Sequence, residues 1–231
     1  SLGQTKPFGA FLKPIQKQDK ASQIFDSDEI FEYKITLSKK SIESLKKEPK
    51  IFVRATFEHK NIKLENVGVR LKGFLGSFRP FDGQNKNGFT VKFNAFKNGQ
   101  RFKGLNKIQL NNAAQDSTFV REKLGYSLFR EAGLPAPRVG HATVLINGAP
   151  FGLYVQVEAS TEDFLKRWFD DASGDLYEGP TDITNWKNLD LDSDPKKAER
   201  GLLIGFAAAA FRAYFIAVSY WPSNIAHQTT K

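Results

Sequence analysis

The chain has 231 residues, of which 40% are hydrophobic and 13% aromatic, so it can bury a core and wholesale disorder is not expected. It contains no cysteine, which excludes disulfide scaffolds, thiolate metal sites and cysteine nucleophiles. Basic residues (34) outnumber acidic ones (25), and the excess is concentrated at residues 34–107, which hold 18 Lys and Arg against 5 acids. Such a field attracts phosphates, nucleotides or acidic protein segments, although lysines also protect strand edges from aggregation.

The first half of the chain predicts a series of strands behind a leader. Residues 1–28 mix Lys, Gln, Pro and Gly without periodicity, so we expect a poorly ordered leader there. Alternating apolar and polar residues at 31–37 predict a half-buried strand, and Ser38 is expected to cap a short helix that ends before Pro49. Further strands are predicted at 51–57, 62–71 and 88–93.

The second half predicts a strand, a helix, a hairpin and another helix. The pair Asn147-Gly148 is a strong hairpin signal, and Asp116 or Ser117 is expected to cap the first helix. This order predicts an α+β protein with a mostly antiparallel sheet and packed helices. The expected elements are a strand at 107–110, a helix at 117–132, strands at 142–146 and 152–158, and a helix after Ser160.

The character of the sequence changes after residue 179. Residues 182–194 are polar and acidic, whereas residues 201–221 are apolar apart from Arg212. A span of about 20 apolar residues can cross a bilayer, but a central Arg costs about 2.5 to 3.5 kcal/mol on insertion. We therefore favour a buried or amphipathic helix, or sequence foreign to the preceding domain, and expect no membrane partner. The predicted organisation is a leader at 1–28, a domain at 29–179, and an acidic linker with an apolar helical tail at 180–231.

A glycine-rich segment follows the strand that ends near Lys72. Gly73, Gly76 and Ser77 stand at the tip of a predicted strand pair, where free backbone N–H groups can hold phosphates. The returning segment brings lysines, which are point charges suited to a phosphate oxygen. A hairpin turn needs glycines as well, so both interpretations stay open. The two lysines are Lys86 and Lys92.

A carboxylate on the helix at 117–132 needs a partner. Glu122 falls within an apolar stripe formed by Phe119, Tyr126 and Phe129, and burying a carboxylate unpaired is costly. One candidate partner is a lysine from the sheet, the pairing by which kinases orient a lysine toward nucleotide phosphates. The alternative is a glutamate that reaches solvent at the edge of the stripe.

Taken in order, the motifs resemble the spore-coat protein H (CotH) kinase family over about residues 25–179. The resemblance rests on both the order and the spacing of the motifs. They include Val67-Gly-Val-Arg-Leu-Lys-Gly73, Phe89-Thr-Val-Lys-Phe93, Leu110-Asn-Asn112, Asp116-Ser117, Arg121-Glu122, Ala132-Gly-Leu-Pro-Ala-Pro-Arg138, Gly152-Leu-Tyr154, Val157-Glu158 and Leu176-Tyr-Glu178.

The resemblance implies an atypical protein kinase that uses ATP with Mg²⁺ or Mn²⁺ to phosphorylate Ser or Thr of coat or surface proteins. It implies a kinase-like N-terminal lobe and a secreted, cell-surface or spore-coat location. By position, the segment from Lys72 to Ser77 would be the glycine-rich loop, and either Lys86 or Lys92 the nucleotide lysine. Glu122 would be the lysine's helix partner, and Val155 to Glu158 the linker against which adenine stacks.

The chain also departs from the family pattern. The family's catalytic and metal-binding Asp residues lie downstream of the Leu-Tyr-Glu motif, and the segment from Gly201 contains no Asp. The resemblance therefore assigns no catalytic residue and no metal ligand, and implies a C-terminal lobe that is truncated or replaced. The alternative function is a non-catalytic coat or surface module that holds acidic partners through a basic face. No nucleic-acid partner is expected, because the basic region lacks a recognised nucleic-acid motif.

Overall fold

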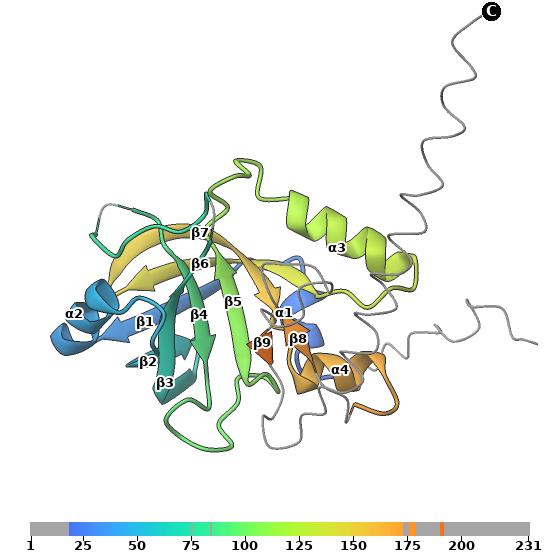
Figure 1. Ribbon diagram of the computed structural model, residues 1–231, viewed down its shortest axis with the longest axis horizontal. Coiled ribbons are helices and arrows are strands. Elements are labelled where there is room, and N and C mark those ends of the chain that lie inside the picture. The colour runs from blue at the N-terminus through green and yellow to red at the C-terminus, as the bar shows by residue number, and fades with distance from the viewer. Residues whose placement is uncertain (1–18, 75, 84, 173–175, 179–189, 192–231) are drawn as a thin grey trace, which may run out of the picture. The chain divides into compact units, whose positions relative to one another are not determined.

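The computed structural model describes residues 19–74, 76–83, 85–172, 176–178 and 190–191 (Figure 1). The chain divides into two compact units, residues 1–170 and residues 171–231. The first unit comprises α1 (Ser22–Phe25), β1 (Phe31–Leu37), α2 (Lys39–Lys47), β2 (Val53–His59), β3 (Ile62–Lys72), β4 (Gly88–Lys92), β5 (Lys107–Asn111), α3 (Arg121–Glu131), β6 (Val139–Ile146), β7 (Ala149–Glu158) and α4 (Glu162–Trp168).

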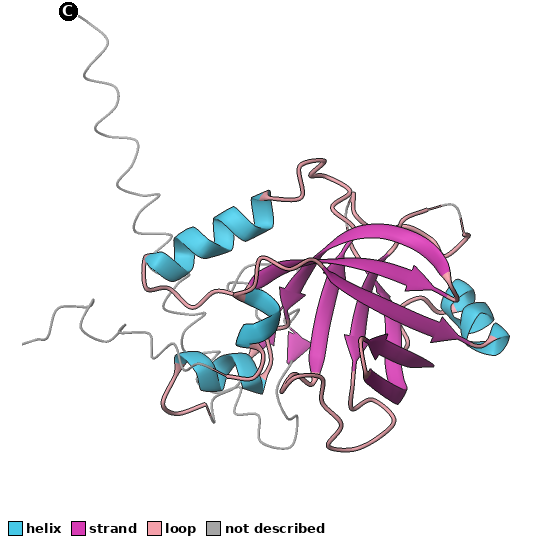
Figure 2. Cartoon of the chain, turned by 180° about the vertical axis from the view of Figure 1, so that it is seen from behind, coloured by secondary structure: helices cyan, strands magenta, loops and turns pink. Residues whose placement is uncertain are grey.

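Seven strands of the first unit form a closed barrel in the order β1-β2-β3-β4-β5-β7-β6 (Figure 2). Neighbouring strands are antiparallel except β1 and β6, which run parallel with Phe31 opposite Ala142. The prediction of an α+β fold with packed helices and a kinase-like lobe is therefore wrong. Alternation predicts strands and hairpin turns predict antiparallel neighbours, but neither reveals the long-range pairing of β1 with β6 that closes the barrel.

The core fills the inside of this barrel with alternate side chains of each strand. In β1, every second residue from Phe31 to Leu37 is buried, as the alternation predicts. Aromatic rings contact one another across the interior, with Phe57 and Phe102 centroids 5.0 Å apart and Tyr33 and Phe57 centroids 4.9 Å apart. Such ring contacts stabilise the interior beyond the area that the rings bury.

Of the first two helices, α1 lies within the predicted leader and α2 lies near the start of the predicted domain. Ile24 and Phe25 of α1 belong to the buried core, although they fall within the segment expected to be poorly ordered. Helix α2 begins after Ser38, whose side-chain oxygen accepts a hydrogen bond from the Ser41 amide at 3.1 Å, confirming the predicted cap. Leu45 fixes α2 by packing into the core.

Helix α3 begins at Arg121, later than predicted, because Asp116 first folds the chain into a turn. Its carboxylate accepts hydrogen bonds from the Thr118 amide at 3.1 Å and from the Arg121 amide at 2.9 Å. Asp116 thus satisfies an N–H of the first helical residue from outside the helix, while Val120 occupies the cap position without a side-chain hydrogen bond. None of the residues of α3 is buried, and Leu124 and Leu128 are more than half exposed.

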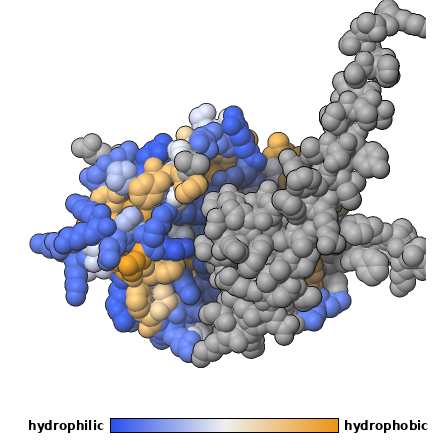
Figure 3. Space-filling model, viewed as in Figure 1, coloured by the Kyte–Doolittle hydropathy of each residue, from blue (hydrophilic) through white to orange (hydrophobic). Residues whose placement is uncertain are grey.

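The outer surface mixes residues of opposite character. In the space-filling view, blue hydrophilic residues alternate with orange hydrophobic ones over the coloured part of the face (Figure 3). Alternation along the strands would by itself direct polar side chains outward, so the hydrophobic residues on this face depart from that pattern.

In the second unit, β8 (Tyr177–Glu178) pairs antiparallel with β9 (Asp190–Leu191), with Tyr177 opposite Leu191. The apolar segment predicted as a buried or amphipathic helix at 201–221 lies outside the described residues. Within the described ranges, no helix has the length and hydropathy needed to span a bilayer.

Candidate functional site

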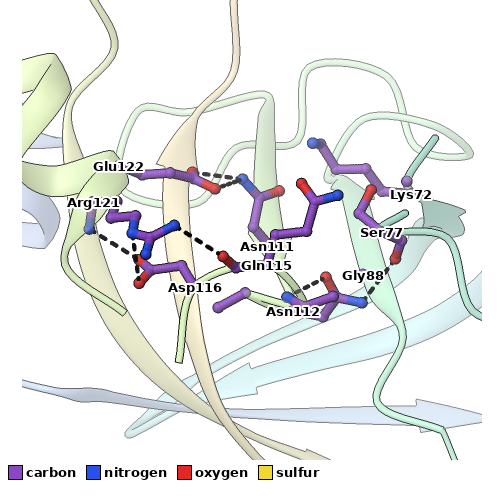
Figure 4. A pocket seen from close by; sticks show the side chains of 12 residues that line it. Lys72, Ser77, Gly88, Asn111, Asn112, Gln115, Asp116, Arg121 and Glu122 are labelled. Atoms are coloured by element: carbon purple, nitrogen blue, oxygen red, sulfur yellow. Dashed lines mark hydrogen bonds and ion pairs between the residues drawn. The ribbon is translucent and has the colours of Figure 1, made fainter. Parts of the chain in front are cut away.

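A cavity of about 350 Å³ opens where β3, β5 and the segment leading into α3 come together. Lys72 and Ser77 approach it from the β3 side, and Arg121 and Glu122 from the α3 side (Figure 4). The remaining lining consists mainly of small and amide side chains. They are Gly73, Gly88, Asn111, Asn112, Ala113, Ala114, Gln115 and Asp116.

The turn after β3 requires glycine for two reasons. Gly73 has φ +127°, a conformation that side chains rarely adopt, and a Cβ there would lie 2.8 Å from the backbone of Phe78. Beyond it, the Ser77 hydroxyl accepts a hydrogen bond from the Phe74 amide at 3.1 Å. Gly76 lies against Gln115, whose amide nitrogen would be 2.2 Å from a Cβ at this position. The turn therefore contributes Gly73 and Ser77 to one wall of the cavity.

A buried amide connects the two ends of the segment between β3 and β4. The Nδ2 of Asn112 donates hydrogen bonds to the carbonyl oxygens of Ser77 and Lys86, both at 2.9 Å. Asn112 is only 7% exposed, so these bonds are shielded from water. The glycine-containing turn is thereby fixed to the end of β5.

The partner of Glu122 is an amide. Both carboxylate oxygens of Glu122 accept from the Nδ2 of Asn111, at 2.9 and 2.6 Å. Because the amide is neutral, the negative charge of Glu122 is oriented but not balanced by it. Beside it, Arg121 lies 3.6 Å from Asp116 and keeps 74% of its side chain exposed. The hydrogen bond from Thr118, together with Arg121, holds the pKa of Asp116 below its usual value.

The two candidate nucleotide lysines occupy different surroundings. The Nζ of Lys86 lies 4.4 Å from the Phe119 ring centroid and 4.8 Å from that of Tyr154, and burial lowers the pKa of this lysine. Lys92 lies on β4, with its Nζ 6.0 Å from the ring of Phe52. Neither side chain lines the cavity, but Lys86 is tied to it through its carbonyl bond with Asn112.

Glu158 belongs to a buried ion network. Its side chain is 2% exposed, and its two oxygens accept from Arg138 at 2.8 Å and from Arg167 at 2.5 Å. Arg138 also contacts Asp19 at 2.8 Å. Burial by itself would lower the pKa of Arg138, but the hydrogen bonds and charges of Asp19 and Glu158 outweigh it and raise that pKa. Both oxygens of the Glu158 carboxylate thus accept their hydrogen bonds from arginine.

The predicted site residues therefore separate into two groups. Lys72, Gly73, Ser77 and Glu122 line one cavity, whereas the other four do not: Gly76, Lys86, Lys92 and Glu158. Sequence reasoning assigned no role to Asn111 and Asn112, although both stand in one of the motifs that carry the family resemblance. Across the described ranges, no three His, Cys, Asp or Glu side chains gather closely enough to hold a metal ion.

Comparison with protein families matches residues 69–202, more than half of the chain, to the family described as CotH kinase protein. The chain belongs to this family, which confirms the resemblance. Among curated proteins, inner spore coat protein H of Bacillus subtilis (strain 168) is 31% identical over 104 residues, or 44% of this chain. The match covers 28% of that relative's length, so the chain corresponds to a part of it.

Proposed function

We propose that this chain supplies the ATP-binding part of a CotH-family protein kinase, with the cavity beside Lys72 receiving the nucleotide phosphates. The observation that supports this most directly is the meeting of Lys72, the turn at Gly73 and Arg121 around one cavity. An ammonium and a guanidinium are groups that bind phosphate in proteins. The cavity volume, about 350 Å³, lies within the range usual for small ligands.

The residues also suit a divalent ion that arrives with the nucleotide. Mg²⁺ is usually held by one or two carboxylates together with substrate phosphates, and it neutralises phosphate charge when bound. Glu122 is the side chain that fits this requirement, because its partner Asn111 leaves the negative charge unbalanced. Asp116 suits it less well, since Thr118 and Arg121 already engage it.

The remaining residues of the cavity would act by positioning. Asn112 holds the β3–β4 segment in place, and Gly73 allows a phosphate to approach the backbone. Lys72 would contribute a point charge. Phosphate transfer to Ser or Thr of a coat protein is the activity proposed for the whole protein, and no residue of this chain is assigned as its catalytic base.

Isothermal titration calorimetry with ATP and Mg²⁺ tests the proposal. We expect Lys72→Ala to weaken binding by at least about tenfold, a loss of about 1.4 kcal/mol. The matched control is Lys39→Ala, which removes an exposed lysine at the start of α2. AMP should bind more weakly than ATP, because the cavity is proposed to hold the outer phosphates. Equal affinities of the Lys72→Ala variant and the unmodified chain would refute the assignment.

A further inference from the structure

A group of cations lies on the outer face of β2, β3 and β4, outside the cavity lining. Three of them project from strands whose other face fills the core, and the fourth, Lys50, lies in the turn before β2. The group also contains two phenylalanine rings. We call it the outer basic patch, and it comprises Lys50, Arg54, Arg70 and Lys92 with the rings of Phe52 and Phe96.

Strand register places two of these cations in one row. Arg54 is opposite Gly68, and Gly68 is opposite Lys92, so the two cations flank a position that has no side chain. Since adjacent strands are about 4.8 Å apart, their backbones are about 10 Å apart. A Cβ on Gly68 would lie 3.0 Å from the ring of Phe52 and 2.5 Å from Ala95. Glycine therefore creates the space in which the Phe52 ring covers β3.

The aromatic rings hold the cations in place. The Arg70 guanidinium lies 5.0 Å from the Phe52 centroid, and the Arg54 guanidinium lies 4.3 Å from the Phe96 centroid. The Nζ of Lys50 donates to the carbonyl of Gly73 at 2.6 Å. These partners are neutral, so they orient positive charge without cancelling it.

No carboxylate neutralises the patch within the described part of the chain. None of its four cations forms an ion pair there, whereas Lys34 and Lys63, also on strands, lie 3.5 Å from Glu32 and Glu58. Burial, and then the charges of Arg70 and Lys72, lower the pKa of Lys50. Crowded like charges repel, and an anionic partner would relieve that repulsion.

We infer that the outer basic patch binds an acidic segment of polypeptide. Arginine guanidinium groups match the geometry of carboxylates and phosphate monoesters. A peptide in the polyproline II conformation returns to the same side every third residue, about 9 Å along its axis, which suits the spacing of Arg54 and Lys92. Single-stranded nucleic acid is disfavoured, because base stacking needs open ring faces and a cation already covers one face of Phe52 and of Phe96.

Fluorescence anisotropy with a labelled peptide carrying Glu at every third position tests the inference. We expect saturable binding that weakens as salt is raised, and no binding of the same peptide with Gln in place of Glu. The double variant Arg54→Gln/Lys92→Gln should bind at least about tenfold more weakly. The control Lys34→Gln/Lys63→Gln changes the net charge equally but alters lysines that already have acidic neighbours. Circular dichroism and the melting temperature would verify that both variants are folded.

Three results would overturn the inference. One is the absence of binding to the Glu peptide, and another is equal weakening by the two double variants, which would mean that net charge alone matters. The third is that single-stranded DNA of equal charge binds more tightly than the Glu peptide and that the Arg54→Gln/Lys92→Gln change abolishes this binding. That result would make the patch a nucleic-acid surface. The inference does not depend on the proposed function, because ATP affinity in the Arg54→Gln/Lys92→Gln variant reports on the cavity separately.

Discussion

Two glutamates from the family motifs occupy contrasting regions of the molecule. Glu158 is almost fully buried and directs both oxygens at Arg138 and Arg167, so its charge is balanced inside the protein. Glu122 is half-buried beside a cavity and receives hydrogen bonds from the neutral amide of Asn111. A balanced, enclosed carboxylate maintains the fold, whereas an oriented but unbalanced one is available to a ligand. Membership of a motif therefore does not distinguish the two roles, but the partners of each side chain do.

The largest effect should come from breaking the buried network. Glu158→Ala would leave Arg138 and Arg167 buried without their shared partner, and removal of one member of a buried ion pair costs about 3–5 kcal/mol. Urea unfolding monitored by circular dichroism would measure the loss. Glu122→Ala, the matched change at the cavity, should cost about 1 kcal/mol, because Asn111 can turn to water. Similar losses in the two variants would contradict the distinction between the regions.

A second effect concerns the enclosed interior at alkaline pH. Tyr33 donates to the Oε1 of Gln156 at 2.5 Å, and burial raises the pKa of Tyr33 and of Tyr154. Above pH 10 the unfolded chain releases these protons first, so the free energy of unfolding should fall as pH rises.

Tyr33→Phe should make the alkaline loss of stability smaller while costing about 1–3 kcal/mol at pH 7, since the Gln156 oxygen loses its donor. Tyr154 offers a matched control, because its hydroxyl has no hydrogen-bond partner among the described residues. Tyr154→Phe should reduce the alkaline loss at little cost at pH 7. Urea unfolding at pH 7, 10 and 11 would check both variants, and a Tyr33→Phe variant with an unchanged pH profile would refute the explanation.

The smallest effect should come from the cavity. Asn111→Ala would free the Glu122 carboxylate and cost about 1 kcal/mol of stability. If orientation of Glu122 assists binding of ATP with Mg²⁺, affinity should fall by about tenfold or less. Calorimetry beside the control Asn98→Ala, an exposed residue of the β4–β5 connection, would measure it. Unchanged affinity in Asn111→Ala would show that orientation of Glu122 by Asn111 does not assist binding.

Local features of the fold were predictable because their physical causes are local. Alternation located β1, Ser38 identified the start of α2, and Asn147-Gly148 located the β6–β7 turn, where both residues have positive φ. The parallel contact of β1 with β6 was not predictable, since it joins segments distant in sequence. Asn147 illustrates this, because its side-chain oxygen also accepts from the Leu37 amide at 2.7 Å and so connects the hairpin to β1.

The candidate site was predictable only in part. The glycines after Lys72 were found because a tight turn constrains residue type, and Glu122 because a carboxylate stood on an apolar stripe. Its partner was not found, since an amide at Asn111 carries no periodicity or charge signal. The role of Glu158 was hidden for a related reason: Arg138 and Arg167 become its partners only after the chain has folded.

Closure of the barrel restricts the ways in which another protein can bind to it. Each of the seven strands has a hydrogen-bonded neighbour on both sides, so the barrel offers no open edge to which a foreign strand could be added. Basic residues on the barrel are then not needed there to prevent edge-to-edge association, and the group formed by Arg54 of β2, Arg70 of β3 and Lys92 of β4 calls for another explanation. A partner of the barrel wall must be recognised through side chains, which makes the identity of each outward residue, rather than the backbone, the determinant of specificity.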